Sequence, residues 1–472
     1  MKTEKDLTQG SLFKGILFFS IPLIFTNLLQ ILFNMTDSAV VGRFVGAIAL
    51  GSVGSTTQLV FFCTGLLTGL GGGINVLAAF YIGRKSAKDL SENINTSAII
   101  SFLFGSGIFL IGFIFAPQVL YLIKTKDELF SGAVIYFRIY MIAMPAVALY
   151  NFGNAILSAH GNTSLPLIFL AVAGGINVIL DLLLVIVFKM GVAGVAIATT
   201  VSQYISCALT LLAVFNGSGS AGGETNNADA NASENSAKPA ELANISDFKF
   251  SFKNLKINSQ KAIEILKIGV PSGLQNCVFA LANLFIQVCV NSFDAKMVAG
   301  NAATMNGDNL VYNIMAAFYT AGATFIGQNY GARKKQRILK SYFVSVFYAA
   351  FVGFSCGTAL YIFGRPFLSL FTEDSVVVDF AMQKFKIMTF SFGISAFMDG
   401  TIAANRGMGK TAIPSLLVIL GSCVFRIAWI YTIFAHFRTI ESLFLLYPFS
   451  WAITAFAEII YFVITYKKIL KD

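Results

Sequence analysis

The sequence predicts an all-α polytopic membrane protein: twelve transmembrane helices in two six-helix bundles that are related by a parallel internal repeat. The chain of 472 residues is 56% hydrophobic with a mean hydropathy of +0.74, and 12% of its residues are charged. Soluble domains carry about twice that charged fraction. Its apolar residues form twelve stretches of about 20 residues or more, each long enough for a helix to cross a hydrocarbon core of roughly 30 Å.

The first half supplies six of these spans, at residues 12–38, 47–82, 94–116, 132–157, 165–188 and 192–215. Pro22, Pro145 and the glycines at 71–73 lie inside them, which is compatible with helices because neighbouring membrane helices satisfy the freed backbone groups. The first stretch is longer than the apolar part of a signal peptide and follows an acidic segment, so we expect it to be a helix. Residues 1–215 form the expected N-lobe.

Residues 216–260 differ in composition from the spans on either side. Gly, Ser, Asn and Ala dominate them, and they have almost no apolar side chain to bury. We therefore expect a flexible cytoplasmic linker. Six further spans follow at residues 262–290, 298–328, 339–364, 378–404, 413–436 and 441–466, and residues 261–472 form the expected C-lobe.

Four sequence motifs recur between the halves at a nearly constant spacing. "FSIPLIF" and "IGVPSGL" are 249 residues apart, as are "VGRFVGAIALG" and "VNSFDAKMVAG". "FYIGRK" and "QNYGARK" are 248 residues apart, as are "GNTSLP" and "GKTAIP". Because each half has an even number of spans, both halves insert the same way up. The repeat is therefore parallel, and such a pair of bundles encloses a central cleft.

The distribution of Lys and Arg predicts the orientation. Of the 33 basic residues, 22 lie on the side of both termini and the linker, 7 lie on the other side, and Arg138, Lys384, Lys386 and Arg426 lie within spans. By the positive-inside rule both termini are cytoplasmic. The net charge of +10 then reflects topology and contact with membrane lipid, and we expect no nucleic-acid partner.

The six cysteines all fall inside apolar spans without CxxC spacing, which is typical of reduced packing residues. With two histidines in the chain, a His-rich metal site is not expected. An enzyme of the membrane would need an Asp-rich diphosphate site or a His/Cys/Glu cluster, and a channel would need a filter-like loop. The sequence contains neither, so we expect a transporter without a cofactor.

Two acids in the first half have no counterpart in the second. Asp181 lies in the apolar run "GGINVILDLLLVIVF" and its repeat equivalent is Trp429, while Asp37 corresponds to Ile286. A requirement common to both lobes would be present in both, so the asymmetry favours a specialised role. A carboxylate in the membrane costs several kcal/mol unless it is protonated, paired or hydrated. Asn177, one turn before Asp181, shares its helix face and could contribute an oxygen to a cation.

The second half has its own polar residues. Gln275, Asn276, Asn283 and Gln287 recur at helical spacing and predict a polar face toward the cleft. Arg426 is expected near the midplane, where an unpaired guanidinium is costly, and Asp308 is the acid nearest in depth. We expect a structural ion pair between them. Asp308 and Asp399 are also candidates for binding a cationic substrate, and Glu458 is a further acid within a span.

The segments "NLLQILFNMTDSAVVGRFVG", "INVILD", "RGMGKTAIP", "FRIAWIYTIF" and "YPFSWAIT" resemble the multidrug and toxic compound extrusion (MATE) family, on its bacterial DinF-like and MepA-like side. The resemblance covers all twelve spans and excludes the linker. It implies a V-shaped pair of bundles in the bacterial inner membrane that exports cationic, amphipathic small molecules in exchange for protons or sodium ions. A monomer is expected.

The family's N-lobe coupling site corresponds to residues of this chain in matching motifs: Asp37 in "NMTD", Asn177 and Asp181 in "NVILD", Thr199 in "IATT", Tyr136 in "VIYFRIY" and Asn154 in "NFGNA". No resident metal is implied, but Asp37, Asn177 and Asp181 could hold a sodium ion. Phe33 stands where related pumps have a tyrosine. Two alternatives are a flippase for lipids or lipid-linked precursors in the same superfamily, and a major-facilitator transporter, which "YIGRKSAKD" faintly resembles.

Overall fold

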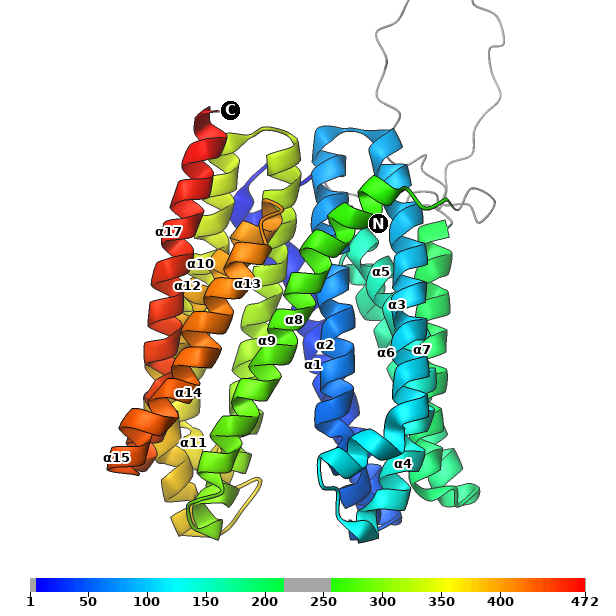
Figure 1. Cartoon of the computed structure of the whole chain (residues 1–472), viewed down its shortest axis with the longest axis vertical. Coiled ribbons are helices and arrows are strands. Elements are labelled where there is room, and N and C mark those ends of the chain that lie inside the picture. Colours follow the sequence, from blue (N-terminus) through cyan, green and yellow to red (C-terminus); the bar gives the residue numbers. More distant parts are fainter. Residues whose placement is uncertain (1–5, 216–255, 472) are drawn as a thin grey trace, which may run out of the picture.

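The computed structural model describes residues 6–215 and 256–471, and within these ranges every regular element is a helix. Figure 1 shows the helices as two bundles, with the N-lobe on one side and the C-lobe on the other. Eleven helices are long and apolar enough to cross a membrane, and the number becomes twelve when one bent pair is counted as a single span. The predicted all-α fold with up to twelve spans is confirmed.

The N-lobe contains the helices α1 (Leu12–Phe44), α2 (Ala47–Arg84), α3 (Ala87–Leu122), α4 (Asp127–Ile142), α5 (Met144–Ala159), α6 (Ser164–Leu182) and α7 (Gly191–Phe215). A π-helical turn, η1 (Leu183–Val187), continues α6. The fourth span is bent by 43° between α4 and α5. Pro145 explains this break, because it cannot donate to the helical ladder and disfavours helical geometry in the residue before it.

The C-lobe contains α8 (Ser259–Val290), α9 (Ala295–Gly331), α10 (Lys335–Ile362), the short α11 (Gly364–Leu368) and α12 (Ser375–Gly407). One span is assembled from α13 (Ala412–Val418), η4 (Ile419–Val424), α14 (Phe425–Trp429), η5 (Ile430–Phe434) and α15 (Ala435–Phe437). The last span joins α16 (Ile440–Phe444) to α17 (Leu446–Lys471). The expected linker falls mainly outside the described residues, and α8 begins at Ser259, three residues before the expected span.

The internal repeat is visible in the backbone. The left-handed residues Lys85 and Arg333, which follow α2 and α9, are 248 positions apart, and Lys189 and Arg438 are 249 apart. The fourth spans differ, because α12 runs unbroken past Gly393, the equivalent of Pro145. The fourth span of the N-lobe is therefore bent at Pro145, whereas the equivalent helix of the C-lobe is continuous at Gly393.

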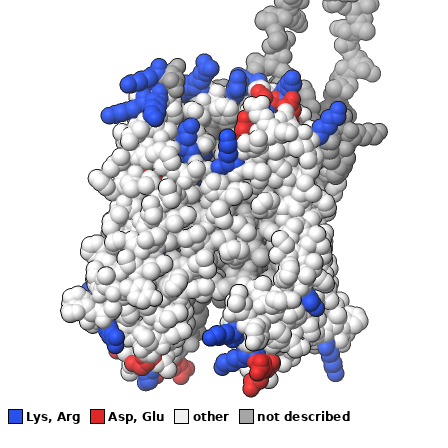
Figure 2. Space-filling view, viewed as in Figure 1, with Lys and Arg blue, Asp and Glu red and all other residues white. Residues whose placement is uncertain are grey.

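The lobes meet at one end of the molecule and separate at the other. We call the end of the molecule with the α2–α3 and α9–α10 turns and the C-terminus the basic end, because its Lys and Arg side chains crowd together in Figure 2. The other end, the opposite end, carries both charge signs, and the surface is notched there between the bundles. The predicted V shape is thus present, closed at the basic end.

Close helix crossings close the V. A Cβ at Gly73 would lie 2.7 Å from the backbone nitrogen of Gly269, and a Cβ at Gly69 would overlap the backbone of Gly273. These two small-xxx-small pairs let α2 and α8 approach to backbone contact, as membrane helix interfaces commonly do. Farther along, Asn75 accepts a hydrogen bond from Thr324 (2.8 Å), which joins α2 to α9.

Candidate functional site

Two carboxylic acids lie inside the N-lobe, in its half toward the opposite end. Asp37 belongs to α1 and Asp181 to α6, and their residues are 8% and 0% exposed. The two carboxyl groups are electrostatic neighbours across the α1–α6 interface. An ionised carboxylate only accepts hydrogen bonds, so the two can bond to each other only when one carries a proton.

Thr199 and Asn177 complete the polar part of this pocket. The Thr199 hydroxyl on α7 lies 3.1 Å from Asp37 Oδ2, to which it can donate. Asn177 is buried one turn before Asp181, and its Nδ2 makes no hydrogen bond with any described residue. Asp37 Oδ1 and both Asp181 oxygens likewise lack a donor there. The pocket therefore has spare oxygen acceptors for a proton or a small cation.

Tyr136 lies near the acid pair. It is buried on α4, Asp37 and Asp181 are among its electrostatic neighbours, and it stacks on Tyr140 at 5.9 Å between ring centroids. Asn154 stands apart from this group. It lies on α5 and accepts a hydrogen bond from Ser158 (3.3 Å), so its described contact is with its own helix.

An aromatic ring also packs beside the acids. The space that a Cβ on Gly174 would take is filled by the ring of Phe33. Phe33 lies one turn before Asp37, and Gly174 lies about one turn before Asn177, so the ring covers one side of the pocket. The sequence showed that Phe33 stands where related pumps have a tyrosine. It did not predict that the Phe33 ring packs against Gly174.

No Lys or Arg is ion-paired with the acid pair in the described part of the chain. Nor do the described residues contain a group of three or more His, Cys, Asp or Glu side chains that could hold a metal. Two uncompensated carboxylates in a low-dielectric interior repel each other when both are ionised. This arrangement suits reversible uptake of one cation.

The structure corrects the ion pair that was expected in the C-lobe. Asp308 on α9 pairs with Lys384 on α12 at 2.9 Å, and the side chains of Asp308 and Lys384 are 19% and 5% exposed. Arg426 instead donates to Ser450 Oγ (3.1 Å) and packs over the ring of Tyr447 at 4.7 Å. Depth alone could not distinguish these two cations, because the partner also depends on which way each helix face turns.

Lys384 is a functional candidate that the sequence did not assign. Besides Asp308, its ammonium donates to Asn301 Oδ1 (3.0 Å). Lys384 is the repeat equivalent of Tyr136, at a spacing of 248. The position that faces acids in the N-lobe thus carries a tethered cation in the C-lobe. Its presence inside a span was the available signal.

The four polar residues predicted to share one face of α8 lie in two different environments. Gln275 is buried and accepts from Ser415 (3.2 Å), while Asn276 donates to the Gly65 carbonyl of α2 (3.1 Å) at the lobe contact. Nearer the opposite end, Asn283 is exposed and accepts from Arg426 (3.4 Å), and Gln287 donates to Asn291 (2.8 Å). Two of the four therefore sit in the closed half of the molecule.

A second set of charged side chains in the C-lobe is buried at Glu458 and half-buried at Asp399 and Arg406. Asp399 on α12 accepts from Ser395 (3.0 Å), and Glu458 on α17 accepts from Asn405 (2.9 Å). Both acids interact electrostatically with Arg406, whose Nε makes no hydrogen bond with a described residue. Asp399 and Glu458 thus have a cationic neighbour, whereas no described Lys or Arg is paired with Asp37 or Asp181.

Comparison with known proteins gives consistent results. The MatE family model matches residues 22–183 and again residues 271–432, 249 positions later. The chain is 26% identical to the probable multidrug resistance protein YpnP of Bacillus subtilis, covering 87% of both chains. It is 22% identical to the multidrug export protein MepA of Staphylococcus aureus, covering 86% of this chain and 85% of MepA.

Solved structures show the same fold. An outward-facing multidrug resistance MATE family transporter of the MOP superfamily superimposes with a TM-score of 0.86 at 20% identity, covering all of both chains. A MOP superfamily transporter from Pyrococcus furiosus, described as having a binding pocket of reverse polarity, gives 0.87 at 19% identity with the same coverage.

Proposed function

We propose that this chain, which belongs to the MatE family, is an antiporter that exports cationic, amphipathic small molecules in exchange for protons or sodium ions. The similarity to the probable multidrug resistance protein YpnP and the multidrug export protein MepA supports drugs as substrates and export as the direction of transport. Family membership excludes the major-facilitator alternative. By the positive-inside rule the basic end faces the cytoplasm of a bacterial inner membrane.

The observation that carries this proposal is the buried acid pair of the N-lobe. Asp37 and Asp181 are electrostatic neighbours, no cationic side chain is paired with either in the described residues, and Thr199 and Asn177 supply further polar groups. A pair of acids in this setting binds a proton, or a sodium ion through carboxylate and hydroxyl oxygens, more readily than it remains doubly charged.

The position of the acid pair explains how cation binding is coupled to substrate export. In the form described here the V is open at the opposite end, so cations from outside can approach the N-lobe pocket. Neutralising Asp37 and Asp181 removes their repulsion and changes the packing of α1 on α6, which favours release of a cationic substrate outward. The gradient supplies about 1.4 kcal/mol per pH unit and about 2.3 kcal/mol per charge per 100 mV.

The test is ethidium efflux from cells or everted vesicles under separately imposed proton and sodium gradients. Asp37→Asn and Asp181→Asn keep the shape of each side chain but remove its charge, and we expect both to lose gradient-driven efflux at normal membrane levels. Asp379→Asn is the matched control, because Asp379 is an exposed acid that pairs with Arg365. The gradient that drives the wild type identifies the ion.

Two results would contradict the proposal. If both acid variants pump as well as the Asp379 control, the buried pair is structural. If the wild type exports ethidium equally well without either gradient, the chain is not a coupled antiporter for this substrate.

A further inference from the structure

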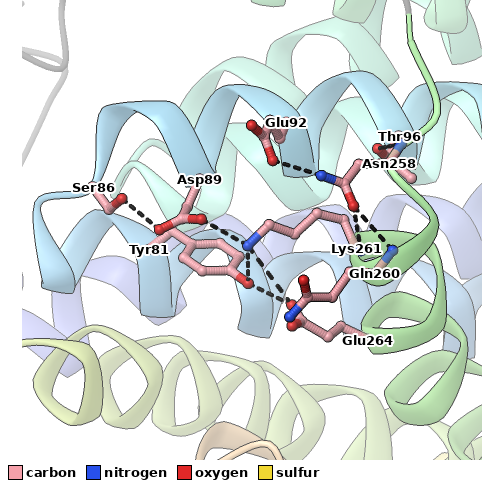
Figure 3. A network of polar contacts seen from close by, with 9 residues as sticks. All are labelled: Tyr81, Ser86, Asp89, Glu92, Thr96, Asn258, Gln260, Lys261 and Glu264. Atoms are coloured by element: carbon pink, nitrogen blue, oxygen red, sulfur yellow. Dashed lines mark hydrogen bonds and ion pairs between the residues drawn. The ribbon is translucent and has the colours of Figure 1, made fainter.

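At the basic end, a cavity of about 520 Å³ opens between the lobes. Its walls come from α2 and α3 of the N-lobe and from α8, α9 and α12 of the C-lobe. Figure 3 shows the polar network along one wall, where side chains of α8 reach those of α2 and α3. This network is separate from the acid pair of the N-lobe. It lies at the start of α8, where the chain enters the C-lobe.

Lys261 lies at the centre of the network. Its ammonium donates to Asp89 Oδ1 (2.9 Å) on α3 and to the Tyr81 hydroxyl (2.8 Å) on α2, and it lies 4.1 Å from the centre of the Tyr81 ring. Tyr81 donates in turn to Glu264, one turn after Lys261 on α8. The Lys261 side chain is 8% exposed. A single C-lobe cation therefore holds two N-lobe helices.

Asn258 extends the same contact. It caps α8 by accepting from the backbone N–H groups of Gln260 and Lys261, and its Nδ2 donates to Glu92 (2.7 Å) on α3. Its own backbone N–H donates to Thr96 Oγ1 (3.1 Å). The first turn of α8 is thus fastened to α3 on two sides, through a side chain and through the backbone.

The other lobe has a counterpart of this contact. The segment before α1 lies against the α9–α10 turn, where Leu7 N–H donates to Gln328 (3.0 Å) and Lys334 donates to the Thr8 carbonyl (2.8 Å). Arg337 adds bonds to backbone carbonyls of residues 7, 9 and 10. Each half of the repeat is therefore attached at its start to the second and third helices of the other half.

The two attachments differ in chemistry. Around the N-terminal segment, Asp6 stays within its own turn. Partial burial opposes its ionisation, yet hydrogen bonds from Thr8 and Gln9 and the charge of Lys334 hold the pKa of Asp6 below its usual range. The C-lobe cations there bind mostly backbone carbonyls. At Lys261, by contrast, the bonds run between side chains, so a single substitution can weaken the attachment.

We propose that Lys261, with Asp89 and Tyr81, is a latch that holds the lobes together at the basic end and has to open before that end can admit substrate. Separation of α2 from α8 would leave the Lys261 ammonium and the Asp89 carboxylate without each other. The latch therefore sets the balance between the closed and open basic end, and Lys261 acts as a positioning residue. The inference rests on the proposed transport function.

The test measures opening of the lobe contact directly. Cys277 is buried on α8, and its thiol lies 3.6 Å from the Phe62 carbonyl of α2. In a full-length protein that keeps Cys277 as its single cysteine, a membrane-impermeant maleimide is applied to the basic end in everted vesicles. Lys261→Met removes the charge at similar length, and we expect labelling to become about three- to tenfold faster.

Three variants make the result specific. Lys267→Met is the matched control, because Lys267 lines the same cavity from the same helix, is exposed, and makes no ion pair within the described chain. Lys261→Arg keeps the charge and should restore slow labelling. Asp89→Asn should speed labelling, and combining it with Lys261→Met should add little, because both remove the same contact.

Equal labelling of the Lys261→Met and Lys267→Met proteins would overturn the latch, as would fully additive effects of the Lys261 and Asp89 variants. The labelling rate does not depend on ethidium transport. A protein that fails to export but labels as expected would therefore contradict the proposed substrate and leave the latch supported, whereas normal export with unchanged labelling would reject the latch alone.

Discussion

A methyl group at Gly69 should open the basic end. Its Cβ would lie 2.8 Å from the Ser272 carbonyl carbon and would overlap the backbone of Gly273, so α2 and α8 have to move apart. Overpacking of this kind costs the closed form about 1–3 kcal/mol, while the helix propensity that alanine gains over glycine applies equally to the closed and open forms, because α2 is helical in both. The equilibrium therefore shifts about five- to 150-fold toward the open basic end.

Gly54→Ala is the control, because no atom lies within 4 Å of its added Cβ and it gains the same helix propensity on the same helix. Spin labels at Lys88 and Arg333, beside the α2–α3 and α9–α10 turns, report the separation by double electron–electron resonance in an otherwise cysteine-free protein. The Gly69→Ala protein should show a larger long-distance population than the control. Identical distance distributions would refute the idea that this crossing holds the lobes closed.

Two further predictions concern the lobes individually. Lys384→Met leaves the Asp308 carboxylate without its partner, so this single variant should have a lower thermal unfolding midpoint in detergent than the double variant with Asp308→Asn. Equal midpoints of the single and double variants would contradict this expectation. Gly174→Leu should displace the Phe33 ring and weaken gradient-driven efflux. Gly175→Leu, at a site with no atom within 4 Å of an added Cβ, should leave efflux unchanged, and equal efflux by the two variants would contradict a role for this packing.

Much of the fold was predictable because the signals are local. Span lengths follow from runs of apolar residues, and the repeat follows from paired motifs that reappear as paired left-handed residues such as Lys85 and Arg333. The bend between α4 and α5 was not predicted. Pro145 lies inside a span, as Pro22 does, yet Pro22 is within the continuous helix α1. The outcome depends on how neighbouring helices pack around each proline.

The candidate site was predictable in part for the same reason. Asp37 and Asp181 stood out because their repeat equivalents are apolar. The cations were harder to assign. Arg426 and Lys384 both lie within spans, and depth alone favoured the wrong partner for Asp308, because a sequence gives the level of a side chain more readily than the direction in which its helix face turns.

Taken alone, the sequence determined that the protein lies in a membrane, how many spans it has and that its halves form a parallel repeat. It also showed that the two span acids without an equivalent in the other half belong to the N-lobe. These are properties of residue composition and spacing along one chain. Only the tertiary structure decided that the V is closed at its basic end, that Lys384 neutralises Asp308 and that Lys261 fastens α8 to α2 and α3. Each depends on the mutual rotation and approach of helices, which are set by backbone contacts such as Gly73 on Gly269.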